Sequence, residues 1–279
     1  MLKLCLGGGT DFSIRYFLDN NKPVKGEAMY RTLLLSSLFS LFMPVLAGAD
    51  EAQNANKSFF DNFSGDIGLY SHYVGRGRVQ ADDDPALQAS INYNQEIAKN
   101  TNIFMGVWGS NTDFNDGDEA TVELDIYGGV SHTLQDLTLK TGFIQYWYPG
   151  ADRGLNYDYY EIMAGASYNF DVLSTSATVK YSPDFFGASG DATYYHFDVN
   201  VPLPHGFAFG AHIGRQEVDQ WAKFGFRDYD HWGARIAYTA KDLKNIRFSL
   251  DYKNTNISRA GCPERWCDGL FVAGVSKSF

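Results

Sequence analysis

The chain lacks any apolar run long enough for a membrane-spanning helix, which needs about 20 consecutive apolar residues. Its one long apolar run, residues 32–46, falls short of that length. Arg31 precedes this run and small residues follow it at 47–49, which is the arrangement of a secretory signal peptide. No cysteine comes just after the cleavage site, which argues against a lipoprotein. We therefore predict a signal peptide over residues 29–49 and a mature chain that begins at Asp50.

The segment before Met29 lacks a regular pattern and would place a polar leader ahead of the signal peptide. The codons for Lys25, Gly26 and Glu27 can contain a purine-rich ribosome-binding sequence a few bases before Met29. We interpret residues 1–28 as translated leader DNA upstream of a true start at Met29. The alternative is a genuinely extended N-terminus. Codons without a purine-rich stretch at 25–27 would remove the support for a start at Met29.

Basic residues are also scarce. The chain has 23 Lys and Arg against 33 Asp and Glu, a formal net charge of −10. Residues 1–49 hold five of the basic and three of the acidic residues, so residues 50–279 carry a formal charge of −12. Nucleic-acid binding needs a basic face, which this balance argues against.

Cysteine is scarce as well, with three residues in the chain. Cys5 lies in the predicted leader, which leaves Cys262 and Cys267 close together in an exported chain. An isolated pair of cysteines in an oxidising compartment predicts a disulfide. A metal bound by two thiolates alone is the less favoured interpretation.

What the chain has in abundance is short alternating segments rich in Tyr and Phe, bounded by Gly, Asn, Asp and Pro. This period-2 pattern predicts strands, and no segment has a convincing amphipathic helical pattern. Each predicted strand is close to the ~9–11 residues that a tilted membrane strand requires. The twelve predicted strands cover residues 64–74, 86–97, 101–110, 120–132, 137–148, 157–170, 172–182, 191–201, 206–216, 229–240, 245–255 and 269–279.

The connections between these strands alternate in length. Short ones cover 98–100, 133–136, 171, 202–205 and 241–244, and long polar ones cover 75–85, 111–119, 149–156, 183–190, 217–228 and 256–268. Outer-membrane barrels have short periplasmic turns and long outer loops. The last strand ends in the aromatic Phe279, as such barrels usually do. The sequence therefore predicts an all-β fold over residues 50–279, a transmembrane antiparallel up-and-down barrel of about twelve strands.

The alternation also predicts which side chains face the lumen. In the segment 120–132, Val122, Leu124 and Ile126 share one face, and Glu123 and Asp125 share the other. A charge on the lipid face costs about 2–4 kcal/mol at the membrane midplane, so the polar face is expected to line the lumen. Aromatic residues cluster near strand ends at 146–148 and 157–160, which favours an interfacial aromatic girdle.

Several blocks of sequence resemble a known family. They are residues 69–77, 84–88, 104–114, 123–129, 148–152, 156–165 and 181–187, in one order over most of residues 60–279. They are similar to the TorF-like family of small porin-like proteins, whose domain is called Gcw_chp. The loop of Cys262 and Cys267 departs from the family pattern, and so does Lys277. The resemblance implies an outer-membrane barrel with a channel role and supplies no substrate.

The predicted lumen carries acidic and basic side chains in near balance. One interpretation is a charged, water-filled pore, and the other is a narrow barrel filled by groups that pair across strands, such as Lys140 with Asp125 and Arg235 with Asp251. The candidate pore-lining residues are Asp66, His72, Glu123, Asp125, Lys140, Glu161, Lys180, His196, Asp198, Arg235, Arg247, Asp251 and Lys253.

The first long connection supplies the constriction candidates Arg76, Arg78 and Asp84. An inward-folded arginine could narrow a pore or bind a carboxylate or phosphate in a bidentate manner. Alternatively, these arginines neutralise the neighbouring acids 82–84. The acidic segment 113–119 fails the EF-hand spacing, so a solvated turn is favoured over a cation site.

The histidines His72, His196, His212 and His231 raise the question of a hydrolase, but no Gly-x-Ser-x-Gly motif accompanies them. We expect a channel for passive diffusion of small hydrophilic solutes in a Gram-negative outer membrane, with no cofactor, no metal and no catalysis. Expected partners are outer-membrane lipid, lipopolysaccharide, the barrel-assembly machinery during insertion and the small solutes, and not nucleic acid. The alternatives are a non-conducting barrel that acts through its outer loops and, less favoured, a lipid hydrolase.

Overall fold

A computed structural model describes residues 59–279 apart from 83, 115–119, 226, 259–261 and 263–265. The chain divides into two units, Met1–Ala55 and Asn56–Phe279, and only the second contains described residues. The predicted leader over 1–28 and the predicted signal peptide over 29–49 lie outside the described residues and stay predictions.

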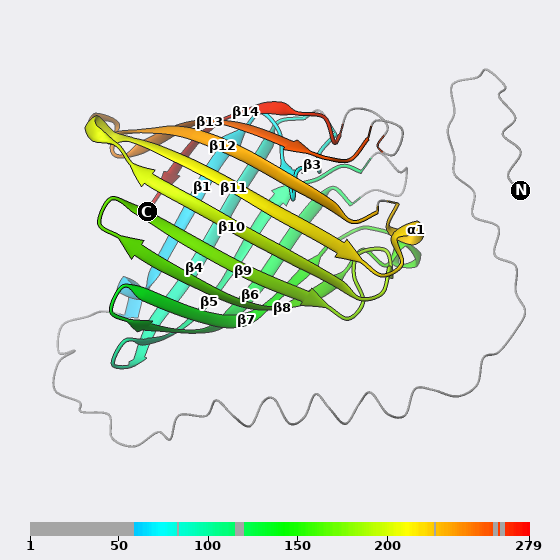
Figure 1. The fold of residues 1–279 in the computed structure, drawn as a ribbon, viewed down its shortest axis with the longest axis horizontal. Coiled ribbons are helices and arrows are strands. Elements are labelled where there is room, and N and C mark those ends of the chain that lie inside the picture. Colours follow the sequence, from blue (N-terminus) through cyan, green and yellow to red (C-terminus); the bar gives the residue numbers. More distant parts are fainter. Residues whose placement is uncertain (1–58, 83, 115–119, 226, 259–261, 263–265) are drawn as a thin grey trace, which may run out of the picture. The chain divides into compact units, whose positions relative to one another are not determined.

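Twelve antiparallel strands close into one barrel, in the order β1-β14-β13-β12-β11-β10-β9-β8-β7-β6-β5-β4 (Figure 1). The predicted fold class is confirmed. The strands are β1 (Phe63–Tyr70), β4 (Ala86–Ala98), β5 (Thr101–Asn111), β6 (Val122–Leu134), β7 (Leu137–Trp147), β8 (Tyr159–Phe170), β9 (Leu173–Ser182), β10 (Ala192–Pro202), β11 (Phe207–Val218), β12 (Tyr229–Ala240), β13 (Ile246–Thr255) and β14 (Leu270–Ser278).

The long connections all leave the barrel at one end, here called the loop end, and the short ones at the other, the turn end (Figure 1). One-turn helices occur at both ends: η2 (Arg153–Leu155) and α1 (Trp221–Phe224) in long connections, η3 (Pro204–Gly206) and η4 (Lys241–Leu243) in turns, and η1 (Phe59–Asn62) just before β1. In the described part of the chain, no helix has the length and apolar character needed to cross a membrane.

The first strand is shorter than predicted. It was expected to run to Val74, but β1 ends at Tyr70. The chain then turns and forms a separate two-stranded hairpin, β2 (Val74–Gly75) and β3 (Arg78–Val79). The alternating pattern continues through Val74 because both the wall and the hairpin are made of extended backbone, so the pattern alone cannot show where one ends.

Closure of the barrel joins the first and last strands. Asp66 lies opposite Ser278 and Tyr70 opposite Gly274 in the β1–β14 register. Gly65 and Phe279 exchange both backbone hydrogen bonds, each 2.9 Å long. Pairing the edges in this way leaves no row of free backbone donors and acceptors along the wall.

The outer face of the wall is apolar, as the alternation predicts. Val122, Ile126 and Val130 of β6 are exposed, and so are Trp232 and Ile236 of β12. The inward neighbours Glu123 and His231 are buried. The period-2 assignment of faces therefore holds on both strands.

Candidate functional site in the barrel interior

The hairpin β2–β3 turns into the barrel instead of standing above it. Val74 and Val79 pack against Val272 on the inner face of β14. The backbone N–H of Val79 donates to the carbonyl of Trp266 (2.8 Å), and that of Asp113 donates to the carbonyl of Gln80 (2.9 Å). The hairpin is thus held by two other long connections as well as by the wall.

The tip of the hairpin presses against β12 and β13, the strands that follow β14 in the wall. Arg76 and Gly77 have φ of 49° and 80°, in the left-handed region. A Cβ on Gly77 would lie 2.5 Å from His231 Cβ and 2.6 Å from Thr255 Cγ2, on β12 and β13. Only glycine combines this backbone conformation with such a close approach.

Arg76 reaches across the whole lumen. Its Nη2 lies 2.7 and 2.6 Å from the two carboxylate oxygens of Glu161 on β8, and its Nη1 donates to Gln216 on β11. Its guanidinium carbon lies 4.3 Å from the ring centre of Tyr194 on β10. In the order of strands around the barrel, β8 and β10 lie on the side opposite β1. The hairpin, which packs on β14, and the side chain of Arg76 therefore together link β14 to the strands on the far side of the lumen.

Electrostatics favour the charged form of Arg76. Burial by itself lowers the pKa of the guanidinium, but the carboxylate of Glu161 more than offsets this, and the pKa lies well above its ordinary value. The side chain of Glu161 is only 1% exposed. Leaving such a carboxylate without its partner would be strongly unfavourable. Of the two earlier interpretations of Arg76, the structure supports the inward-folded arginine.

A second contact joins the hairpin to β6. The hydroxyl of Tyr73 donates to Glu123 Oε1 (3.1 Å), and its ring lies 5.4 Å from that of Trp108 on β5. Burial, and then the charges of Glu123 and Asp125, raise the pKa of the Tyr73 hydroxyl well above its ordinary value. Glu123 Oε2 and Asp125 Oδ1 are buried without a hydrogen-bond partner.

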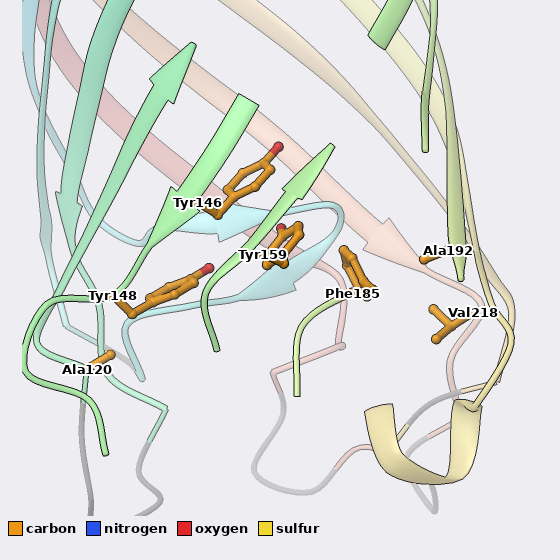
Figure 2. Packing of buried hydrophobic residues seen from close by; sticks show 7 residues of the cluster. All are labelled: Ala120, Tyr146, Tyr148, Tyr159, Phe185, Ala192 and Val218. Atoms are coloured by element: carbon orange, nitrogen blue, oxygen red, sulfur yellow. The ribbon is translucent and has the colours of Figure 1, made fainter. Parts of the chain in front are cut away.

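Aromatic side chains surround the hairpin at the loop end. Figure 2 shows the rings of Tyr146, Tyr148 and Tyr159 at the ends of β7 and β8, in one cluster with Phe185. The predicted aromatic girdle is therefore wrong for these three tyrosines, which are buried inside, and it stays a prediction for Trp147 and Tyr160, which are exposed on the outside. Alternation divides each run of consecutive aromatics between the two faces.

The space left beside the hairpin is small. A cavity of about 80 Å³ remains there, and its walls include Tyr73, Arg76, Glu123, Tyr148 and Tyr159. Such a volume accommodates several water molecules or one small ligand. The hairpin and the aromatic rings around it therefore occupy much of the loop end.

The turn end of the lumen is different. Lys140 and Asn200 lie on the inner face of the wall and are nevertheless exposed to solvent, as is Asp66. Short hydroxyl side chains line this region: Ser278 donates to Asp66 and Ser176 to Asp198. Inward side chains that are exposed mean that protein atoms do not fill this part of the lumen.

Of the thirteen candidate pore-lining residues, all but His72 lie on the inner face of the wall. His72 follows the end of β1, with its Nδ1 3.0 Å from Ser71 Oγ. Arg78 lies on the hairpin with its guanidinium carbon 5.1 Å from the ring centre of Phe224, and Asp84 donates its backbone N–H to the carbonyl of Ala81 in the same connection.

The two predicted cross-strand pairs have different outcomes. Arg235 and Asp251 stand opposite each other in the β12–β13 register, and Arg235 Nε donates to the Asp251 carboxylate. Lys140 stands opposite Ser131, several residues from Asp125 along β6, and no salt bridge joins Lys140 to Asp125. Adjacent strands were correctly identified in both cases, but only the register decides which residues meet.

Three histidines gather on the inner face of β10, β11 and β12. The ring centres of His196, His212 and His231 lie 5.5 to 6.2 Å apart, and Tyr194 Oη is 2.9 Å from His231 Nε2. Within the described residues, no group of three or more His, Cys, Asp or Glu side chains could hold a metal ion. His212 was missing from the predicted pore-lining set, although it alternates with the outward Ile213.

The disulfide is present. Cys262 and Cys267 are bonded, with S–S 2.04 Å, and both are buried at the loop end. Trp266 beside them packs against the cluster of Val74, Val79 and Val272. The disulfide therefore belongs to the long connection that helps to hold the hairpin.

Sequence reasoning missed Tyr73, Tyr146, Tyr194 and Gln216 as interior contacts of the hairpin. Tyrosine is ordinary on either face of a barrel strand, and Gln216 comes at the end of an alternating segment, so neither residue type stood out. The alternating pattern indicates which way the side chains on the strands point, but it does not show that they contact the hairpin inside the barrel.

The geometry defines a closed, twelve-stranded antiparallel barrel with a polar interior and a hairpin inserted at its loop end. Residues 53–279 match the family described as "Bacterial protein of unknown function (Gcw_chp)", and the chain belongs to this family. The match does not test the name TorF-like. None of the curated proteins matches the chain.

Solved structures with a similar fold include membrane proteins. A structure from "Unveiling the Mechanism Behind the in-meso Crystallization of Membrane Proteins" has TM-score 0.50 and 9% identity, over 77% of this chain and 83% of its own. "KdgM porin" has TM-score 0.49 and 11% identity, over 77% and 99%. The "COG4313 outer membrane channel from Pseudomonas putida F1" has TM-score 0.46 and 8% identity, over 77% and 94%. These likenesses concern the fold alone.

Proposed function

We propose that the chain is an outer-membrane channel for passive diffusion of small hydrophilic solutes, with the β2–β3 hairpin as its constriction. The observation that carries this proposal is the division of the wall between an apolar outer face and a polar inner face. Lys140, Asp66 and Asn200 are solvent-exposed although they face inward. A barrel with a polar, solvent-accessible lumen and an apolar outer face is suited to form a channel through a bilayer.

The placement in the membrane rests on side-chain energetics. Exposed apolar residues cover the outside of the strands, for example Ile91, Phe143, Phe197 and Ile236. A lysine or arginine at the midplane of that face would cost about 2–4 kcal/mol. We propose that the loop end faces outward beside lipopolysaccharide, and that the chain is exported through its signal peptide and inserted by the barrel-assembly machinery.

Passage through the barrel would be limited at the loop end. Arg76 and the rings around it leave little free volume, so only small solutes are expected to pass without movement of the hairpin. The charged residues there, Arg76, Glu161 and Lys180, would set the charge selectivity, because potentials act most strongly in a narrow, poorly hydrated passage. No catalytic step is part of this proposal.

One observation favours a second candidate. The hairpin fills the loop end and is fixed to both walls. A barrel closed in this way could act through its outer loops, as an element of the envelope or in surface interaction. The distinction between the two candidates is whether ions cross the protein.

Single-channel recording of the protein in a planar bilayer, at two salt gradients, tests the proposal. Discrete current steps with a reversal potential are expected, and the sign of that potential gives the charge selectivity. A folded protein, with the heat-dependent gel mobility of a barrel, that gives no steps would contradict the channel and favour the non-conducting barrel.

A further inference from the structure

The cavity beside the hairpin presents more basic than acidic side chains. Arg76 and Arg78 line it, and Glu123 is the one carboxylate among the described residues of its wall. Glu123 is only 3% exposed and accepts a hydrogen bond from the hydroxyl of Tyr73. Asp125, two residues along β6, is not part of this wall and has its Oδ1 buried. A solute in the cavity therefore meets two guanidinium groups and one largely covered carboxylate.

The salt bridges around Glu161 expose the bases and bury the acid. Arg76 is 15% exposed and Glu161 is 1% exposed. The Nζ of Lys180 lies 3.8 Å from the same carboxylate, and this lysine is 19% exposed. One buried carboxylate thus faces two cations, which leaves one positive charge in excess beside the hairpin.

The same arrangement occurs farther from the hairpin. Arg235 on β12 is 46% exposed, and its partner Asp251 on β13 is 7% exposed. Lys140 on β7 also faces inward and is exposed. Water in the lumen therefore contacts the basic member of the Arg235 pair more than the acidic one, as it does beside the hairpin.

Acidic side chains also face water on the inner wall, but on the turn side of the hairpin. Asp66 is exposed there and accepts a hydrogen bond from Ser278. Asp198 is 26% exposed and accepts hydrogen bonds from Ser176 and Asn200. Charges act most strongly on an ion where the passage is most constricted and least hydrated. The charges beside the hairpin therefore count more than these two acids.

We propose that the channel selects small anions over cations, and that Arg76, Arg78 and Lys180 set this preference. The inference rests on the proposed channel function and adds its solute class, which comprises small carboxylates as well as inorganic anions. The formal charge of −12 over residues 50–279 does not oppose it. Charges outside the passage are screened over about 8 Å at physiological salt, so they act weakly on an ion inside.

The reversal potential of the full-length protein in a planar bilayer, under a potassium chloride gradient, tests this preference. Chloride should cross about three times more readily than potassium. Lys180→Gln removes a positive charge beside the hairpin and should lower that ratio about twofold. Arg235→Gln should lower it less, because its charge lies farther from the hairpin. The matched control is Lys277→Gln, which removes a lysine opposite the outward Ile67 and should leave the ratio unchanged.

The outcomes separate this inference from the channel itself. Current steps with a preference for potassium would overturn the anion preference and leave the channel in place. Absence of steps from folded protein would remove both. An unchanged ratio in Lys180→Gln and Arg235→Gln would also contradict the inference, and either variant suffices if the other does not fold.

Discussion

The loop end and the turn end of this barrel share the same strands but have different interiors. At the loop end, Glu161, Gln216 and His231 are buried by the hairpin and by aromatic rings. At the turn end, the inward Lys140 and Asn200 are exposed. The wall alone therefore does not determine whether the lumen is open. One long connection, inserted from one end, produces the difference.

Two ion pairs of the interior, one at the loop end and one halfway along the wall, also differ. Arg76 and Glu161 are 15% and 1% exposed, and they join residues far apart in the sequence. Arg235 and Asp251 are 46% and 7% exposed, and they lie opposite each other on adjacent strands. The first pair holds the hairpin in place across the lumen, and the second only strengthens strand pairing that the backbone already provides.

The largest expected effect comes from removing the hairpin. Replacing residues 74–79 with a glycine-serine linker of equal length should raise the single-channel conductance several-fold, because the lumen would then be as wide at the loop end as at the turn end. Planar-bilayer recording measures this. The same replacement of turn residues 241–244 is the control and should leave the conductance unchanged. Equal conductance in all three proteins would show that the hairpin does not limit the passage.

A smaller change at the hairpin tip should act on stability. Arg76→Ala leaves Glu161 buried without its partner, which costs about 3–5 kcal/mol for a buried pair. Lys140→Ala, on the exposed inner face of the turn end, should change stability by less than about 0.5 kcal/mol. Urea unfolding followed by tryptophan fluorescence compares the two. Similar losses in both variants would mean that the two ends are equally packed.

The sequence predicted the wall well and its filling poorly. The twelve strands follow from local alternation, and their ends agree with the structure to within two or three residues except at Tyr70, where β1 leaves the wall. Alternation also places Glu123, Glu161 and Lys180 inside. It cannot show that Arg76 meets Glu161, since that contact depends on how far a connection reaches across a closed lumen. The sequence also does not show the register of neighbouring strands. The predicted pair of Arg235 with Asp251 was therefore right, and the predicted pair of Lys140 with Asp125 was wrong.

Gly77 offers a sharper test of the close approach at the hairpin tip. Gly77→Ala adds a Cβ that would lie 2.5 Å from His231 Cβ, at φ 80°. We expect a loss of about 1–3 kcal/mol from backbone strain and the clash together. Gly150→Ala is the matched control, because Gly150 has φ 91° and an added Cβ there would have no heavy atom within 4 Å. This variant should show the cost of backbone strain alone. Equal losses in urea unfolding would mean that the tip is not pressed against β12.

The smallest expected effect concerns the pair of Arg235 and Asp251, in which the arginine is half-exposed and the carboxylate is buried. Arg235→Ala should cost less than Arg76→Ala, because solvent reaches the Arg235 side of this pair and screens it. The difference from the unsubstituted protein should shrink in 1 M salt, where the screening length is about 3 Å. The loss caused by Arg76→Ala should not shrink, since its pair is buried. Urea unfolding at low and high salt measures both, and the same salt dependence for the two would contradict the contrast drawn between the pairs.

The most direct test of the division into a closed loop end and a wet turn end uses two serines on the inner face of β9. Ser182 is fully buried at the loop end, and Ser174 is half-buried at the turn end. Ser182→Cys and Ser174→Cys, each in a Cys5→Ser background, would be reacted with a charged, membrane-impermeant thiol reagent in folded protein. Because Cys262 and Cys267 are bonded to each other, only the introduced thiol should react. Labelling at least tenfold faster at position 174 than at 182 is predicted, and equal rates would contradict the account.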